Sequence, residues 1–282
     1  MKDILEEILA YKRKEVEREK AELPPERLFA LVEGGRADDF GKAASRGMPM
    51  PCEANARQRR SMRKSLAASR SGIIAEFKRK SPSKGWIKEE GRADVIPAAY
   101  AEAGAAALSI LTDEKYFGGC LDYIRQARPM TGTPILRKEF IIDEYQLYQA
   151  RHAGADAVLL IAAALTRPDY GRLARKAHEL GLEVLLEIHA EKELDYLAER
   201  PDMLGVNNRN LGTFHTDVEN SFRIASLLPD DLLWVSESGI SEPDTVRRLR
   251  DAGFRGFLMG EAFMRQPSPG AALETFIQSV ER

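Results

Sequence analysis

The segment EVLLEIH, residues 183–189, shows the pattern that decides the fold. A short apolar run, Glu183–Leu186, ends there in a charged residue, Glu187. Seven more runs of this kind occur, and all but one end in polar residues or glycine: Ile73–Phe77, Ala107–Leu111, Pro134–Leu136, Ala157–Ile161, Met203–Val206, Leu232–Val235 and Gly256–Met259. Strands that are buried on both faces of a parallel sheet are continuous apolar runs. The eight runs therefore predict eight parallel strands.

Helix-like stretches follow the runs, and Gly-containing turns separate the repeats. The expected helices are Ala93–Ala103, Leu121–Arg128, Glu144–Ala153, Tyr170–Leu180, Lys192–Ala198, Val218–Leu227, Pro243–Ala252 and Pro269–Val280. Gly104, Gly154 and Gly253 are expected to cap helices in the left-handed conformation. This alternation predicts an α/β fold, a single (β/α)8 TIM barrel. The carboxyl ends of the strands hold the active site in that fold, so the polar endings are candidate site residues.

The first part of the chain does not follow this alternation. Residues Ile4–Lys20 have the apolar spacing of an amphipathic helix. Gly34–Pro51 has a loop composition, and the basic segment Arg57–Arg70 is expected to be a helix with a solvated charged face rather than a surface that steers an anionic substrate. We expect residues 1–70 to be an amino-terminal helical extension packed on the barrel, and residues 71–282 to be the catalytic barrel.

Composition narrows the class of protein. The chain has 282 residues, of which 44% are hydrophobic and 30% charged, and its formal net charge is −2. No global field therefore favours nucleic acid or an acidic membrane. Cys52 and Cys120 lie far apart without metal-ligand spacing, so we expect reduced thiols in a cytoplasmic protein. No apolar stretch is long enough for a membrane helix, and the charged start is unlike a secretory signal. We expect no nucleic-acid or membrane partner, and a monomer or homodimer.

Two late strand endings and one early loop suggest an anion site. Ser236–Ile240 and Met259–Ala262 follow the seventh and eighth runs, where phosphate sites of such barrels occur. Glycine lets the backbone approach an anion closely. Ser81–Gly85, after the first run, adds hydroxyl groups and a lysine. Each segment alone is also consistent with a tight turn. In a closed barrel, however, the three segments are neighbours. Together they predict a binding site for a phosphorylated small molecule.

Four charged residues at strand ends indicate acid–base chemistry. They are Glu76, Lys78, Lys138 and Glu187. Buried charges are costly unless they pair, although any one of these residues alone is consistent with a surface ion pair. Lysines and carboxylates close together shift one another's proton affinities, which suits general acid–base catalysis.

Other side chains near the predicted mouth suggest substrate contacts. Asn207 and Arg209 end the sixth strand, where they would orient a polar substrate and hold a carboxylate. Trp86 and Phe140 are candidates to flank an aromatic group, and for Phe140 core packing is an equal alternative. The histidines form no ligand-like pair, and His152 and His178 are expected on helix surfaces. We expect no metal site.

The chain resembles the indole-3-glycerol-phosphate synthase family over nearly its whole length. The strings that carry the resemblance are AYKRKEVE (10–17), IIAEFKRKSPSKG (73–85), ALSILTDEKYFGG (107–119), PILRKEFIIDEYQ (134–146), GADAVLLIAAAL (154–165), EVLLEIH (183–189), GVNNRNL (205–211), VSESGI (235–240) and GFLMGEAFMR (256–265). The resemblance implies a carboxy-lyase of tryptophan biosynthesis that uses neither cofactor nor metal. Its substrate would be 1-(2-carboxyphenylamino)-1-deoxy-D-ribulose 5-phosphate, and its product indole-3-glycerol phosphate.

The resemblance also implies roles for the catalytic candidates. Lys138 matches the general acid that protonates the sugar carbonyl, and Glu187 matches the general base. Lys78 matches a lysine that contacts the substrate carboxylate and delivers a proton during dehydration. Glu76 matches the carboxylate that positions these groups. Asn207 matches a polar contact to the substrate.

The remaining matches concern binding. Arg209 matches another polar substrate contact, and the phosphate contacts match Ser81, Ser238, Gly239 and Gly260. Two positions depart from the family pattern, since Glu139 stands where Asp is common and Glu144 stands where Pro is common. Glu261 is within the variation of the family, but it places a carboxylate near the anion site. The change at Glu139 puts the position of Lys138, and hence the rate, in doubt.

Three other functions remain as alternatives. Phosphoribosylanthranilate isomerase resembles this family in its phosphate site, but it uses a Cys/Asp acid–base pair. A Schiff-base aldolase is possible in principle because Lys138 ends a strand. A non-catalytic sensor of a phosphorylated ligand would have little use for the acid–base set.

Overall fold

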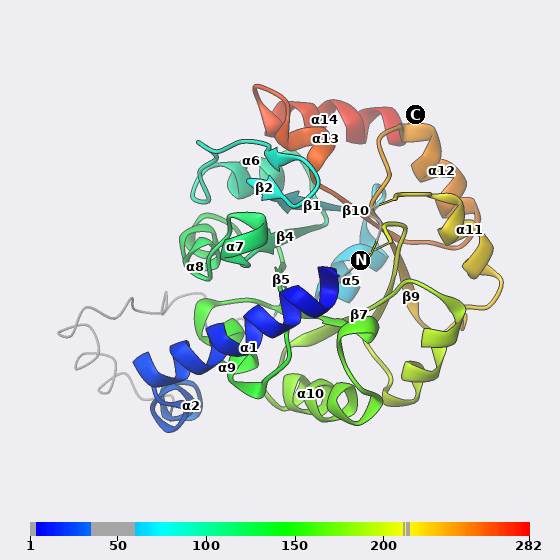
Figure 1. Cartoon of the computed structure of the whole chain (residues 1–282). Helices are drawn as coiled ribbons and strands as arrows, with labels where there is room; N and C mark the ends of the chain where they lie inside the picture. The colour runs from blue at the N-terminus through cyan, green and yellow to red at the C-terminus, as the bar shows by residue number, and fades with distance from the viewer. Residues whose placement is uncertain (1–3, 35–59, 211, 213–214) are drawn as a thin grey trace.

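Eight parallel strands form a closed barrel in the computed structural model, which describes residues 4–34, 60–210, 212 and 215–282. The strands are β1 (Ile73–Phe77), β4 (Ala107–Leu111), β5 (Ile135–Lys138), β6 (Ala157–Ile161), β7 (Glu183–Ile188), β8 (Met203–Asn207), β9 (Leu233–Glu237) and β10 (Gly256–Met259). Their order around the barrel is β1-β10-β9-β8-β7-β6-β5-β4. The predicted TIM barrel is confirmed, and Figure 1 shows the ring of strands with helices outside it.

Several strands run further than the apolar pattern predicts. Lys138, Glu187 and Asn207 lie within β5, β7 and β8 rather than beyond them. β-Sheet hydrogen bonds join backbone groups, so a polar side chain continues a strand wherever its neighbour supplies partners. Ile161 of β6, for example, pairs with Glu187.

Helices cover the outside of the barrel. They are α6 (Ile96–Glu102), α7 (Glu114–Phe117), α8 (Asp122–Ala127), α9 (Glu144–Ala153), α10 (Arg167–Glu179), α11 (Glu219–Ala225), α12 (Pro243–Asp251), α13 (Glu261–Met264) and α14 (Pro269–Val280), with the 3-10 helices η1 (Arg128–Met130), η2 (Ala162–Ala164) and η3 (Glu191–Glu199). The segment expected as an α-helix over Lys192–Ala198 is thus the 3-10 helix η3. Gly104, Gly154 and Gly253 have φ values of 93°, 96° and 109°, the left-handed geometry predicted for them.

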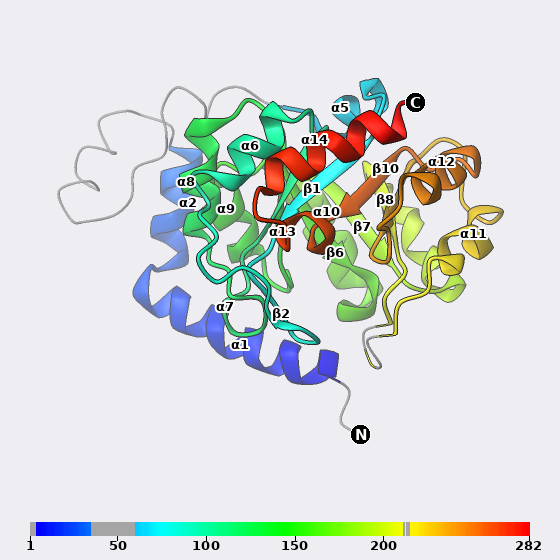
Figure 2. The same ribbon diagram turned by 90° about the horizontal axis from the view of Figure 1, so that it is seen from above.

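The amino-terminal segments contact both ends of the barrel. Helix α1 (Ile4–Glu22) crosses the face where the strands end, and α2 (Pro25–Glu33) packs beside α9 (Figures 1 and 2). Helix α5 (Met62–Ala68) lies at the opposite end, where Ser65 Oγ donates to the carbonyl of Ala106. The loop predicted over Gly34–Pro51 falls outside the described residues apart from Gly34, as does Cys52. The division into residues 1–70 and 71–282 stays a prediction.

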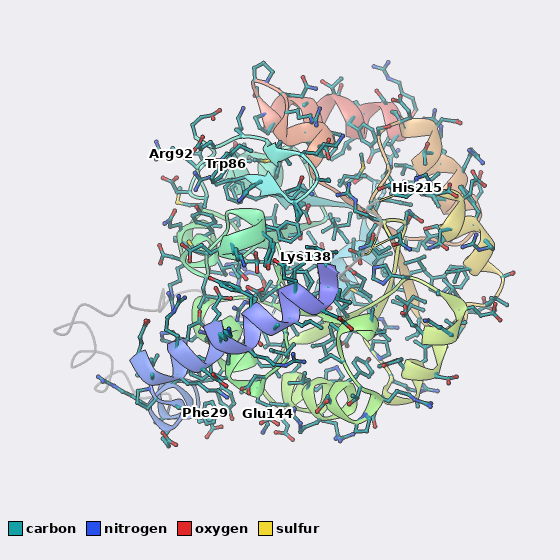
Figure 3. All side chains as sticks on the ribbon, in the orientation of Figure 1. Phe29, Trp86, Arg92, Lys138, Glu144 and His215 are labelled. Carbon is teal, nitrogen blue, oxygen red and sulfur yellow. The ribbon has the colours of Figure 1, made fainter. Side chains whose placement is uncertain are left out.

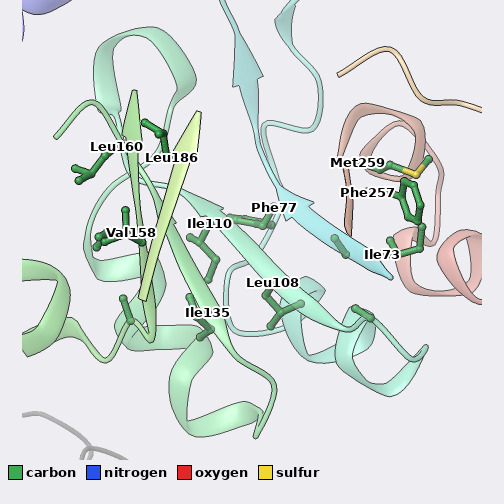
Figure 4. Packing of buried hydrophobic residues seen from close by; sticks show 14 of the residues in the cluster. Ile73, Phe77, Leu108, Ile110, Ile135, Val158, Leu160, Leu186, Phe257 and Met259 are labelled. Atoms are coloured by element: carbon green, nitrogen blue, oxygen red, sulfur yellow. The ribbon is translucent and has the colours of Figure 1, made fainter. Parts of the chain in front are cut away.

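The core has two layers separated by the strands. Alternate residues such as Val158 and Leu160 of β6 face the surrounding helices, and Figure 4 shows this outer layer. The intervening residues, such as Leu159, fill the barrel interior together with apolar residues of α1 and α5. Because side chains of a strand alternate between its faces, a residue two positions after an inward apolar residue also points inward.

A short hairpin follows β1. It consists of β2 (Lys80–Ser81) and β3 (Gly85–Trp86), which pair in antiparallel fashion. The tip of the hairpin, Pro82, Ser83 and Lys84, lines the same cavity as the polar residues at the carboxyl ends of the strands.

Candidate active site

Alternation along the strands collects polar side chains at one end of the barrel. Glu76 lies two residues after the interior residue Ile74, and Lys138 lies two residues after Leu136. The other three follow the same rule: Glu187 after Leu185, Asn207 four residues after Met203, and Glu237 after Val235. All five line one cavity of about 630 Å³. In Figure 3, Lys138 lies near the centre of the barrel, by the first turns of α1.

Lys138 occupies the middle of this cavity between two carboxylates. Its Nζ lies 2.6 Å from Oε2 of Glu187 and 2.7 Å from Oε2 of Glu237. The side chains of Glu187 and Glu237 are 2% and 1% exposed, so water screens these charges little. The three groups therefore titrate as one coupled unit.

The proton affinities in this unit move in opposite directions. Burial would lower the pKa of Lys138, but the negative charge of neighbouring carboxylates, Glu187 first, outweighs burial and raises it. Burial also raises the pKa of Glu187, and the charge of Lys138 reverses that effect and holds the pKa below its usual range. For Glu237 burial dominates and raises the pKa to about 8. One carboxylate and one carboxylic acid thus flank a charged lysine near neutral pH.

A glycine on the neighbouring strand makes room for Glu237. A Cβ atom at Gly205 of β8 would lie 2.3 Å from Oε1 of Glu237. Any larger residue at position 205 would displace this carboxyl group. Oε1 of Glu237 is buried and has no hydrogen-bond partner among the described residues, which leaves it available to a bound molecule.

Lys78 and Glu76 form a second ion pair in the cavity. Nζ of Lys78 lies 2.7 Å from Oε1 of Glu76, and Ser109 Oγ donates to the other carboxylate oxygen over 3.4 Å. Gly260 allows this arrangement, because a Cβ there would lie 2.9 Å from Oε1 of Glu76. The glycine at position 260 therefore makes room for the Glu76–Lys78 ion pair and also lies at the expected anion site.

One end of the cavity has the features of an anion seat. Ser238 and Gly239 are both left-handed, with φ values of 69° and 79°, and they line the cavity with Gly260. Successive left-handed and turn residues point backbone N–H groups toward a common concavity. Glu261 also lines this end, and Arg265 pairs with it at 2.7 Å, which offsets the carboxylate noted in the sequence.

Arg209 connects two loops at the rim. Its Nη1 lies 3.5 Å from Oγ of Ser83, and its Nε donates to Oγ1 of Thr216 over 3.2 Å. Its backbone N–H donates to Oδ1 of Asn207. Arg209 and Asn207 both line the cavity, so a guanidinium and an amide face the same space as the lysines.

The opposite wall of the cavity is apolar, and part of it comes from the amino-terminal helix. It is formed by Ile4, Leu5 and Ile8 of α1 with Leu111, Phe117, Phe140, Leu159 and Ile161 of the barrel. Phe140 therefore lines the cavity as predicted. Sequence reasoning did not assign the α1 residues to the site, although their amphipathic spacing marked a face that needed a partner.

Three expectations are not met by the geometry. Ser81 does not line the cavity: it is 1% exposed, and its Oγ is buried without a hydrogen-bond partner among the described residues, while Ser83 and Lys84 line the cavity. Trp86 is 47% exposed and lies over Arg79 and Lys80, away from the cavity lining.

The third expectation that the geometry does not meet concerns His152. It is buried rather than at the surface, because α9 is covered by α2 and α1 as well as by its neighbours in the barrel. Burial, with a smaller effect of Arg125, lowers its pKa to about 4.

Glu237 is the partner of Lys138 in the cavity that sequence reasoning missed. Its segment was interpreted only as an anion-binding turn. Alternation from the apolar Val235 would have placed residue 237 inside the barrel with Glu187 and Lys138. In the described residues, no three or more His, Cys, Asp or Glu side chains are grouped to hold a metal ion.

Fold and site together define a (β/α)8 barrel enzyme with a buried acid–base centre. Solved structures resemble the chain in fold alone. A 3-hexulose-6-phosphate synthase has a TM-score of 0.59 at 14% identity, with 74% of this chain and 99% of that chain covered. The tryptophan synthase subunit alpha from Legionella pneumophila also has a TM-score of 0.59, at 16% identity and with coverages of 78% and 98%.

Sequence comparison narrows the class to one family. The family model described as "Indole-3-glycerol phosphate synthase" matches residues 5–276. A protein of that name from Bacteroides thetaiotaomicron is 57% identical over 281 residues, with both chains fully covered. Another from Polaromonas naphthalenivorans is 48% identical over 217 residues, which are 75% of this chain and 81% of that protein. The chain belongs to the indole-3-glycerol phosphate synthase family, and it is a carboxy-lyase of tryptophan biosynthesis.

Proposed function

We propose that Lys138, Glu187 and Glu237 are the acid–base centre with which this chain closes an indole ring. The chain has the activity of its family, the conversion of 1-(2-carboxyphenylamino)-1-deoxy-D-ribulose 5-phosphate to indole-3-glycerol phosphate. The observation that carries the proposal is the position of Lys138, whose Nζ lies within 2.7 Å of both carboxyl groups inside the cavity. Ring closure forms one carbon–carbon bond, and the product then arises by loss of carbon dioxide and water.

In this proposal Lys138 is the first proton donor. The ring carbon that bears the carboxylate attacks the sugar carbonyl, and Lys138 protonates the carbonyl oxygen as charge develops on it. Because neighbouring carboxylate charge raises its pKa, Lys138 would be a poor proton donor unless another group supplied a proton to its amine. Glu237, which burial keeps protonated near neutral pH, lies 2.7 Å away and returns a proton to the amine.

The later steps need a base and a second acid. After carbon dioxide leaves, the new hydroxyl group departs as water, and a proton is removed from the ring. We assign the base to Glu187, the carboxyl group whose pKa stays below its usual range. We assign the second acid to Lys78, and Glu76 holds its ammonium group at 2.7 Å in the same cavity.

The two ends of the cavity give the substrate one orientation. The aromatic ring would lie against the apolar wall that includes Phe140 and α1, and the phosphate would lie at Ser238, Gly239 and Gly260. Arg209 and Asn207 lie between the two ends and would hold the polar groups of the substrate. Ser83 and Lys84 take the place at the anion end that the sequence suggested for Ser81.

The proposal includes a cellular setting. No helix in the described part of the chain is long and apolar enough to cross a membrane. Cys120 forms no disulfide within the described residues. We propose a cytoplasmic enzyme that acts on a free phosphorylated substrate as a monomer or homodimer.

A fluorescence assay tests the proposal directly. Purified protein is given the carboxyphenylamino-deoxyribulose phosphate, and the indole product is followed by its emission. We expect turnover without added metal or organic cofactor, and turnover that is unchanged after treatment with a chelator. Normal turnover by a Lys138→Ala variant would overturn the assignment of the acid–base centre while leaving the activity of the chain intact.

A further inference from the structure

His189 lies directly behind the carboxylate assigned as the base. It is the first residue after β7, two positions from Glu187, and its side chain is 14% exposed. Its Nε2 lies 3.3 Å from Oε1 of Glu187, whereas Oε2 of the same carboxylate lies 2.6 Å from Nζ of Lys138. The two oxygens of Glu187 therefore have different nitrogen partners, one in the cavity and one behind it.

Neighbouring elements hold His189 in place. Its backbone N–H donates to Oε2 of Glu193 in η3, and its carbonyl accepts from Nδ2 of Asn220 in α11. Nδ2 of Asn220 also lies 3.4 Å from the carbonyl of Asn207. One amide thus connects the backbone at His189 to the backbone at Asn207. The backbone of His189 is therefore held by Glu193 and Asn220, which do not line the cavity themselves.

The ring has few other partners. Nδ1 lies 3.8 Å from Oε2 of Glu193 and Nε2 lies 3.3 Å from Glu187, while neither nitrogen forms a well-directed hydrogen bond within the described residues. Buried polar nitrogens are normally paired, so an imidazole kept between two carboxylates needs an explanation. We find that explanation in Glu187: the imidazole would hold its carboxylate in position and stabilise the charge of that carboxylate.

We propose that His189 is a positioning residue, which holds Oε1 of Glu187 so that Oε2 faces Lys138 and the substrate. This proposal rests on the assignment of Glu187 as the base. Without the imidazole, only Lys138 and the side chain of Asn207 would hold the carboxylate, and Oε1 would lose the partner behind it. Displacements of about 1 Å in such groups cost on the order of 100-fold in rate.

His189 also contributes charge to the centre. Glu187 faces Lys138 and Glu237, with Glu76 further across the cavity, and His189 faces Glu193 from η3. Burial raises the pKa of Glu187, and the charges of Lys138 and then His189 lower it. Loss of the imidazole therefore moves this pKa upward. Since the base acts when it is ionised, the acid limb of the pH–kcat profile should move to higher pH.

Two substitutions and a matched control test the proposal. His189→Leu removes both the contact and the charge, and His189→Gln keeps an amide donor without the charge. His178→Leu is the control, because His178 also pairs with a carboxylate, Asp202 at 2.9 Å, but lies 42% exposed on the outside of the barrel. For each variant, kcat and KM are measured between pH 3 and pH 9, so that the profile reaches toward the low pKa of Glu187, and the thermal unfolding midpoint is measured as well.

We expect His189→Leu to lower kcat by about 10- to 100-fold with little change in KM. His189→Gln should recover part of kcat, yet both variants should show the acid limb at higher pH. The control should match the wild type. A fall in kcat with an unmoved acid limb in both variants would leave only a structural role and overturn the proposal, as would unchanged kinetics. If His189→Leu does not fold, the kcat and the acid limb of His189→Gln alone test the proposal. Normal turnover by Glu187→Gln would instead overturn the assignment of the base.

Discussion

Lys12 of α1 and Glu139, the residue after Lys138, form a buried ion pair across the wall of the active site. Nζ of Lys12 lies 2.9 Å from Oε1 of Glu139 and 2.9 Å from Oδ2 of Asp113, and it also pairs with Glu15. Burial would lower the pKa of Lys12, but the charges of Glu139 and Asp113 raise it. One ammonium group thus fastens the amino-terminal helix to the ends of β4 and β5.

This contact also explains how Glu139 is accommodated. Its second oxygen accepts from Thr112 Oγ1 and lies 3.7 Å from Nη2 of Arg137, and its first accepts from the backbone of Phe140. Arg137 thus pairs with an acidic neighbour. The longer side chain is fully partnered next to Lys138, whose Nζ lies between Glu187 and Glu237.

Removal of Lys12 should weaken the fold. In Lys12→Met, three buried carboxyl groups lose their shared cation, and breaking a buried pair costs about 3–5 kcal/mol. Urea unfolding of the variant should show a loss of that order. Lys20→Met is the control on the same helix, because Lys20 pairs with Asp143 at a partly exposed site, where such pairs contribute about 1 kcal/mol or less. Equal losses in the two variants would contradict the role given to Lys12.

The acid–base centre should respond strongly to single substitutions. Lys138→Ala and Glu187→Gln should each lower kcat by about 100-fold or more, because each removes a proton donor or acceptor. The fluorescence assay measures both. Lys176→Ala, which removes a surface lysine paired with Glu179, should leave kcat unchanged. Near-normal turnover in both site variants would show that the roles are misassigned.

Arg209 should act mainly in binding. Arg209→Ala removes a guanidinium that faces the cavity, so KM should rise while kcat changes much less. A loss of one charge-assisted hydrogen bond is worth about 1.5–3 kcal/mol, which is on the order of 10- to 100-fold in affinity. Arg175→Ala, at an exposed pair with Glu199, is the control. An unchanged KM would count against the role of Arg209 in holding a substrate group.

The raised pKa of Glu237 should appear in the pH dependence of stability. The folded protein keeps this proton up to a pKa of about 8, whereas an unfolded glutamate loses it near about 4.3. Between these values the folded state binds more protons, so this group makes the wild type less stable as pH rises. Glu237→Gln removes the effect.

The free energy of unfolding is therefore measured for both proteins from pH 5 to pH 8. The value for Glu237→Gln minus that for the wild type should increase with pH over this interval. A constant difference would mean that Glu237 is ionised in the folded protein throughout, and the assignment of a proton-returning group beside Lys138 would fail.

Local sequence patterns predict the barrel and most of its site. Each apolar run specifies a buried strand, and the residue at its end is placed by alternation, as Glu76 and Lys138 show. Glu237 was not predicted, because Gly239 two residues later indicated a turn. Only the inward direction of Val235 shows that the side chain of Glu237 also points into the barrel. The polar contacts among distant strand ends then follow from closure of the barrel.

Other features depend on packing that no local pattern records. Ser81 and Ser83 are two residues apart in one loop, and only the pairing of β2 with β3 decides which of them meets the cavity. His152 is buried because other helices pack around α9, and the partner of α1 could not be inferred from its amphipathic face. Such facts arise from contacts between segments far apart in the chain.

The apolar wall supplied by Ile4, Leu5 and Ile8 links ligand occupancy to the attachment of α1. A molecule that touches this wall gains those contacts only while the helix is docked, so its binding free energy opposes helix release. Substrate or product should therefore shield the many lysine and arginine bonds of α1 from trypsin. The concentration that gives half-maximal shielding would then report affinity without any turnover.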